Sequence, residues 1–325
     1  MGLTASTHKF SLSIMEGLNL SEVYSCKLSD GQCNIYGSTI LTCTNVAAII
    51  INLLHLPVLR NMPRLRELNY FWVLVNISLG DLFMSMTTIL STNCLVQVLN
   101  NRVVVALIHV LINTTFQARY WLLALALLDR FYAVCKPFKY TTSKVTNNVG
   151  KLSALGWSLN LLLSMIKTFA SLEGLCFSDV VGPVIKKPSD ISKYLDFAAI
   201  LAALVPSIIS TVLLVLVAKE LKRMNQRRNE TGEENDTKSA TRYIIGTFIM
   251  FYVSLIPTVI LLVVYITKDD NSEIDVTWLE VLTFLAHVLY GVGNTLLYGA
   301  LNKAYIVKIK SMCGALRNIV KVSPQ

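Results

Sequence analysis

The chain alternates long apolar runs with short polar connections. Seven of these runs are long enough to cross a membrane as helices, which takes about 20 mainly apolar residues. The third run is long enough either to tilt or to project beyond the membrane. The pattern predicts an all-α membrane protein built as a seven-transmembrane helix bundle. The runs cover residues 38–59, 68–92, 103–134, 150–172, 194–218, 243–266 and 278–301.

Composition strengthens this prediction and excludes other classes of protein. Hydrophobic residues make up 54% of the chain and charged residues 15%, whereas soluble domains carry roughly a quarter charged residues. The spans contain no H-E-x-x-H or G-x-S-x-G pattern and no paired catalytic carboxylates, so we expect no enzyme and no catalytic residue. The 7 cysteines are too scattered for a zinc pattern. We therefore expect neither a metal site nor a cofactor.

The distribution of positive charge predicts which end of the bundle faces the cytoplasm. The segments that join alternate spans on one side, with Lys151, hold 19 of the 29 Lys and Arg residues, and the segments on the other side hold 7. Basic loops stay in the cytoplasm. We therefore expect a membrane role for the net charge of +9 and no nucleic-acid partner. The predicted parts are an outer N-terminal tail, 1–37, a membrane domain, 38–301, and an inner C-terminal tail, 302–325.

The predicted outer segments carry candidate modification sites. Asn19 begins the triplet Asn-Leu-Ser, which is either a glycosylation site or a chance match. Cys26, Cys33, Cys94 and Cys176 lie in the same outer segments. Outside the cell cysteines oxidise, so one or two disulfides are expected, and their pairing stays open.

Ionisable residues inside the spans are costly and indicate pairing or function. Asp81 in the second run and Arg119 in the third each lie about 16–18 Å from the inner surface, at 1.5 Å per residue. We expect them to form a buried ion pair, because either charge alone would be uncompensated; the alternative is that Arg119 faces lipid. Asp129 and Arg130 stand where the third run meets the inner surface.

Several motifs occur in the order found in the rhodopsin-like (class A) G-protein-coupled receptors. Residues 76–83, NISLGDLF, are similar to the second-helix motif around a buried aspartate. Residues 129–138, DRFYAVCKPF, resemble the D-R-Y motif and its downstream proline, in a form common among odorant receptors. Residues 294–298, NTLLY, resemble N-P-x-x-Y, and residues 302–305 resemble the entry to helix eight. Further matches are Trp157 of helix four, Pro206 and Pro257 of helices five and six, and Phe251.

This resemblance implies a plasma-membrane receptor that binds an extracellular ligand and activates a heterotrimeric G protein. It implies that Asp129 holds Arg130 at rest and that Arg130 meets the G protein in the active state. Tyr298 would then swing inward on activation, and Asn294 would join the polar network near Asp81. A ligand that binds the active conformation more tightly populates that conformation.

Other residues depart from the family pattern. Arg119 stands where the family usually has a small polar residue that helps the second-helix aspartate hold sodium, so we expect no sodium site. Leu255 stands where a tryptophan often acts as a toggle, Thr295 replaces the proline of N-P-x-x-Y, and Thr237 replaces an acid that often restrains the D-R-Y arginine. These changes either raise basal activity or are compensated elsewhere. Val105 replaces a helix-three cysteine, so the family's usual disulfide is absent in its normal form.

The resemblance also implies a ligand pocket in the outer half of the bundle. Ile112 stands where amine receptors carry an aspartate, and Val288 where retinal proteins carry a lysine, so neither ligand is expected. The mostly apolar lining favours a small, modestly polar molecule. The alternative is that its polar groups serve helix–helix hydrogen bonds. The candidate pocket residues are His109, Ile112, Asn113, Phe116, Gln117, Thr258, Phe284 and His287.

The odorant-like residues 129–138 favour a chemosensory receptor. A receptor for a peptide or a lipid is the alternative within the family, and a seven-helix transporter or a scaffold without signalling is the alternative outside it. Residues 303–316 alternate apolar and basic positions and predict a short amphipathic helix eight on the inner membrane surface, in contact with lipids. Cys313 within it is a candidate palmitoylation site.

Overall fold

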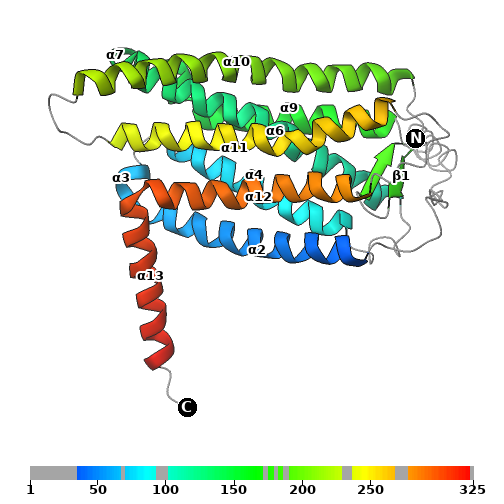
Figure 1. Cartoon of the computed structure of the whole chain (residues 1–325), viewed down its shortest axis with the longest axis horizontal. Helices are drawn as coiled ribbons and strands as arrows, with labels where there is room; N and C mark the ends of the chain where they lie inside the picture. The colour runs from blue at the N-terminus through cyan, green and yellow to red at the C-terminus, as the bar shows by residue number, and fades with distance from the viewer. Residues whose placement is uncertain are drawn as a thin grey trace, which may run out of the picture.

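The structure, a computed structural model, is a bundle of helices that run side by side (Figure 1). It describes residues 35–66, 70–92, 102–170, 175–178, 182–185, 190–228, 236–267 and 277–322. Within these residues, 7 helices are long and apolar enough to cross a membrane. The predicted seven-transmembrane bundle is therefore confirmed. Its helices are α2 (Ile35–Arg60), α4 (Tyr70–Thr92), α6 (Arg102–Cys135), α9 (Val149–Ala170), α10 (Asp190–Arg228), α11 (Asp236–Thr267) and α12 (Thr277–Leu301).

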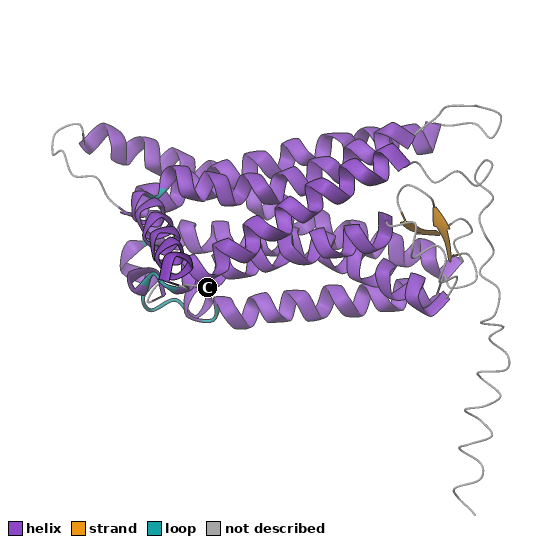
Figure 2. Ribbon diagram, turned by 90° about the horizontal axis from the view of Figure 1, so that it is seen from below, coloured by secondary structure: helices purple, strands orange, loops and turns teal. Residues whose placement is uncertain are grey.

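Shorter elements mark the two ends of the bundle. At one end lie α3 (Pro63–Arg66), α7 (Pro137–Tyr140), α8 (Lys144–Asn147) and the start of α13 (Lys303–Val322), and we call this the α13 end. At the other, the hairpin end, lies an antiparallel pair of strands, β1 (Leu175–Ser178) and β2 (Gly182–Ile185). Figure 2 shows the pair beside the helix ends. The all-α prediction missed this hairpin, whose register pairs Cys176 with Val184.

Helix α6 lies at the centre of the bundle. It packs against α4, α9, α10 and α11, while α12 packs against α2, α4 and α11. Ala126 and Leu127 of α6 are fully buried, whereas Leu54 of α2 and Ile208 of α10 keep about three-fifths of their surface exposed, at 62% each. Exposed apolar side chains on the outer helices fit a surface that faces lipid. The buried stripes of the same helices supply the core.

Local sequence explains where the central helices end and how closely they approach. Helix α6 stops at Cys135, because Pro137 disfavours helix in the residue before it and begins α7 instead. A Cβ atom at Gly156 of α9 would overlap the indole of Trp121 on α6. Trp121 Nε1 donates a hydrogen bond to the Leu152 carbonyl at 2.9 Å. A glycine thus lets the two helices pack ring against backbone, as small residues do in membrane bundles.

Helix α13 leaves the bundle after Asn302 and projects away from it, past the end of α2 (Figure 1). Asn302 makes this change of direction, because its Oδ1 accepts a hydrogen bond from the Tyr305 backbone amide at 3.1 Å and so caps the new helix. The helix extends to Val322 and is longer than the predicted segment 303–316.

Candidate functional site

A buried ion pair joins α4 to α6 in the middle of the bundle. Arg119 Nη2 lies 2.9 Å from Asp81 Oδ1, and the two side chains are only 4% and 2% exposed. The second carboxylate oxygen accepts a hydrogen bond from Asn294 Nδ2 of α12 at 3.0 Å. Both oxygens of one carboxylate therefore hold side chains from two other helices.

The surroundings of this pair are closely packed. Arg119 Nη1 donates to the His287 carbonyl at 3.4 Å, and its guanidinium carbon lies 5.2 Å from the centre of the Tyr290 ring. A Cβ atom at Gly291 would lie 3.0 Å from Asp81 Cβ, so glycine lets α12 approach the carboxylate. The positive charge beside Asp81 therefore belongs to a side chain of the protein, Arg119.

A second ion pair lies at the α13 end of α6. Arg130 Nε donates to Asp129 Oδ2 at 3.0 Å, and Nη2 contacts the same oxygen. Tyr140 of α7 donates to the other oxygen, Oδ1, at 3.0 Å. Burial, and then the nearby Asp129 charge, raise the pKa of Tyr140 to about 12, so its hydroxyl stays protonated and can donate at neutral pH. The short helix α7 is thereby tied to the acid that holds Arg130.

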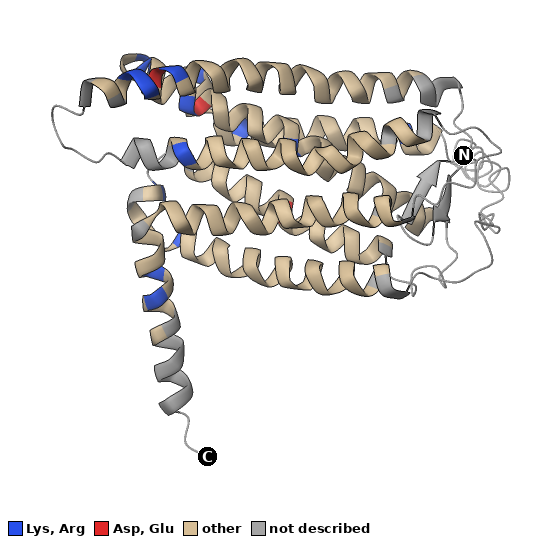
Figure 3. Cartoon of the chain, in the orientation of Figure 1, with Lys and Arg blue, Asp and Glu red and all other residues tan. Residues whose placement is uncertain are grey.

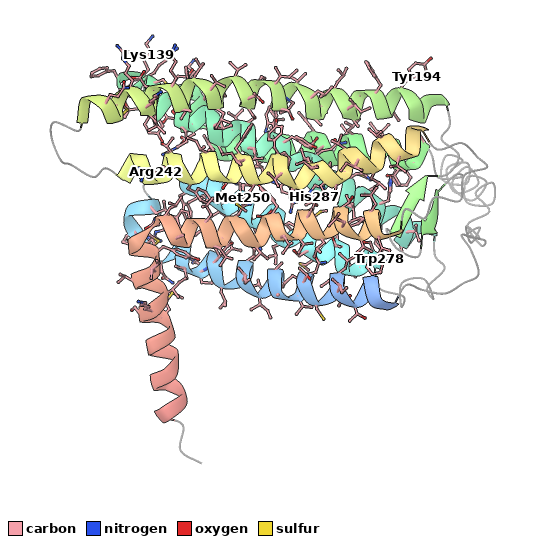
Figure 4. The ribbon with its side chains drawn as sticks, viewed as in Figure 1. Lys139, Tyr194, Arg242, Met250, Trp278 and His287 are labelled. Carbon is pink, nitrogen blue, oxygen red and sulfur yellow. The ribbon has the colours of Figure 1, made fainter. Side chains whose placement is uncertain are left out.

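Three of the candidate ligand residues come together in the middle of the bundle. The Phe116 ring meets the His287 ring edge-on, with centroids 4.9 Å apart. His287 Nε2 lies 3.0 Å from Thr258 Oγ1, so the three residues join α6, α11 and α12. Figure 4 shows His287 inside the bundle, far from Tyr194 and Trp278 at the hairpin end.

Other candidate ligand residues make contacts elsewhere on α6 and α9. His109 Nδ1 lies 2.8 Å from Thr168 Oγ1 of α9, and Asn113 Nδ2 donates to the His109 carbonyl at 2.9 Å. Both histidines therefore make helix–helix hydrogen bonds, the alternative that the sequence left open. Gln117 is buried on α6, and Ile112 and Phe284 are half-buried.

An aromatic cluster at the α13 end contains residues that the sequence prediction missed. Tyr298 of α12 meets three rings edge-on: His55 of α2, Tyr243 of α11 and Tyr305 of α13, with centroids 5.6, 5.1 and 5.1 Å away. His55 Nδ1 lies 2.5 Å from Tyr305 Oη. We call these four residues the aromatic cluster. A histidine within the first apolar run was the signal that could have revealed it, because such a residue needs a partner.

The structure also contains a groove with a different set of lining residues. It has a volume of about 720 Å³ and lies between α4 and α9. Trp72 and Phe83 of α4 and Trp157 of α9 line it. None of the candidate ligand residues is among its lining residues, so this groove is not the predicted pocket.

Several predicted modification residues lie outside the described part of the chain. These are Asn19, Cys26, Cys33 and Cys94. Cys176 lies in β1, and Cys313 lies in α13. The predictions of disulfides, glycosylation and palmitoylation therefore stay predictions.

Basic residues collect at the α13 end, as Figure 3 shows. Most belong to the ends of long helices or to the short helices between them. The exposed members are Arg60, Arg66, Lys136, Lys139, Lys144, Lys151, Lys219, Lys222, Arg223, Arg242 and Lys310.

Comparison with known protein families identifies a family for this chain. The family described as 7 transmembrane receptor (rhodopsin family) matches residues 44–292, most of the chain. This range includes the Asp81–Arg119 and Asp129–Arg130 pairs and ends just before Asn294. No curated protein matches the chain.

Proposed function

Because the chain belongs to the rhodopsin family of seven-transmembrane receptors, we propose that it binds an extracellular ligand between its helices and activates a heterotrimeric G protein. Membership of this family makes it a multi-pass receptor of the plasma membrane rather than an enzyme. The ligand acts by population shift, since it stabilises the conformation that docks the G protein.

The observation that carries the proposal is the buried pair at the α13 end. Arg130 is 5% exposed and is held by the adjacent Asp129, which Tyr140 also contacts. A buried cation that is held by one carboxylate can exchange that partner for another when the helices move apart. On activation Arg130 leaves Asp129 and meets the G protein, and Asn294 and Tyr298 rearrange above it.

The proposed orientation puts the α13 end in the cytoplasm. The exposed lysines and arginines at that end support it, because basic segments stay on the cytoplasmic side. Residues 1–37 are then an extracellular tail, 38–301 the receptor domain, and 302–325 helix eight and a cytoplasmic tail. Helix α13 lies against anionic lipid, with Cys313 as the palmitoylation site.

The proposed ligand is a small, modestly polar molecule. Phe116, Thr258 and His287 support this, because they combine one apolar ring with two hydrogen-bonding side chains from different helices. The odorant-like residues 129–138 favour a chemosensory role. A peptide or lipid ligand is the second candidate.

Guanine-nucleotide exchange tests this function. The native chain and Arg130→Ala are compared at matched surface abundance, across a panel of G proteins, with and without mixtures of small volatile molecules. Arg102→Ala, at the other end of the same helix, is the control. We expect exchange that depends on Arg130 and not on Arg102. Exchange that is equal in the native chain and Arg130→Ala under every condition would contradict the proposal, and substrate flux lost on mutation of Asp81 would favour a transporter.

A further inference from the structure

The aromatic cluster connects four helices through one side chain. Tyr298 contacts the other three rings, and its hydroxyl accepts a hydrogen bond from Asn302 Nδ2 at 3.1 Å. Tyr298, Tyr243 and Tyr305 are each 2–3% exposed. Any movement of Tyr298 must therefore break ring contacts with α2, α11 and α13 at once.

Helix α2 holds this cluster through two polar residues on one face. Asn52 and His55 are three residues apart, which puts their side chains next to each other on the helix. Thr295 Oγ1 donates to Asn52 Oδ1 at 3.4 Å, and His55 shares a hydrogen bond with Tyr305 Oη at 2.5 Å. Thr295 and Tyr298 are also three residues apart and are therefore neighbours on the surface of α12. Thr295 contacts Asn52, and Tyr298 contacts His55.

The His55–Tyr305 hydrogen bond closes the cluster. His55 is 2% exposed within a membrane-spanning helix, where a polar ring without a partner is costly. Its ring centre lies 5.2 Å from the Tyr305 ring and 5.6 Å from the Tyr298 ring. The hydrogen bond therefore fixes α13 against α2 and keeps Tyr298 between them.

We propose that His55 and Tyr305 form a latch that holds Tyr298, and with it the inner half of α12, in the resting conformation. This inference rests on the proposed signalling function and adds a regulatory role for α2, which carries none of the predicted switch residues. Asn52 and Thr295 form a second, weaker restraint of the same kind, at the position where α12 has threonine instead of a kink-forming proline. In the active state Tyr298 leaves the ring contacts, and the latch opens.

The latch predicts a specific pattern of basal activity. Tyr305→Phe keeps the ring and removes only the hydroxyl, and His55→Phe keeps an aromatic ring and removes the hydrogen-bonding nitrogen. The net contribution of one neutral hydrogen bond corresponds to roughly a two- to tenfold change in an equilibrium constant. Each variant should therefore raise ligand-free nucleotide exchange roughly two- to tenfold. The double variant should exceed neither single variant, because both remove the same bond.

The matched control is Tyr194→Phe, which removes a hydroxyl from a tyrosine that is 78% exposed at the other end of the bundle. It should leave basal exchange unchanged. Arg130→Ala combined with Tyr305→Phe should abolish the increase, since the latch acts on the signalling state.

A conformational measurement separates the latch from the signalling function. Spin labels on non-natural amino acids at the exposed positions Arg60 of α2 and Arg242 of α11 report the distance between these helix ends in purified receptor without G protein. Tyr305→Phe should increase the longer-distance population by the same factor as exchange, while thermal stability falls little. A change in distance without exchange supports the latch and contradicts G-protein coupling. The latch is overturned if Tyr305→Phe changes neither the distance between the labels nor basal exchange. It is also overturned if Tyr305→Phe and His55→Phe give equal gains in basal exchange that add in the double variant.

Discussion

Replacing Arg119 by methionine should destabilise the bundle strongly, because the change leaves the Asp81 carboxylate buried without its cation. The carboxylate is 2% exposed and would retain only the Asn294 amide as a described partner. Asp81→Asn should be at least as damaging, since the arginine that it leaves behind cannot lose its charge.

The magnitude follows from the burial of the pair. Removing one member of a buried ion pair costs about 3–5 kcal/mol, which corresponds to roughly a hundred- to ten-thousandfold change in the folding equilibrium. Replacing both members, as Asp81→Asn with Arg119→Met, leaves no uncompensated charge and should recover most of that loss. Reversing the charges is a poorer test, because Gly291 packs against Asp81 and leaves little room for an arginine.

Thermal unfolding of purified receptor in lipid nanodiscs measures the effect. The native chain, both single variants and the double variant are compared with Lys151→Met, which removes an exposed cation and should leave the midpoint unchanged. We expect the native chain and the double variant to have higher unfolding midpoints than both single variants. The reasoning is refuted if Arg119→Met unfolds like Lys151→Met, or if the losses of the single variants add in the double variant.

Three further predictions follow from the packing and the hydrogen bonds. Gly156→Ala should lower the free energy of unfolding by about 1–3 kcal/mol, because the added methyl group overpacks against Trp121. Ala154→Gly on the same helix should lower the free energy of unfolding by less. Tyr140→Phe should raise basal nucleotide exchange roughly ten- to hundredfold, because it removes a hydrogen bond to a charged group. The stabilisation of the resting state by this bond should persist below pH 10 and be lost as pH rises through the raised pKa of about 12. Replacing potassium by sodium at constant ionic strength should not change ligand-free nucleotide exchange of the native chain. In Arg119→Ser, ligand-free nucleotide exchange should depend on sodium. A sodium response in the native chain would contradict the prediction.

Much of the bundle was readable from the sequence. The seven apolar runs predicted the seven spans to within a few residues at most ends. Counting residues along two helices put Asp81 and Arg119 at one depth, and the structure brings their side chains to 2.9 Å. The roles of these residues in signalling stay predictions.

Other features could not be read in this way. The strands β1 and β2 have 4 residues each, too few for a periodic pattern to stand out. The contact between His55 and Tyr305 joins residues 250 positions apart. The ligand candidates show the same difference, because the resemblance to the family grouped His109 with His287, whereas in the structure His109 contacts Thr168 of α9.

The sequence by itself determined how many helices cross the membrane and how deep each polar residue lies. Both depend on local properties, because the thickness of the hydrocarbon layer and the cost of unpaired backbone groups apply to each segment separately. Only the tertiary structure decided which faces meet. That choice depends on the rotation of each helix, which close contacts such as that between Gly156 and Trp121 fix once several helices are packed together.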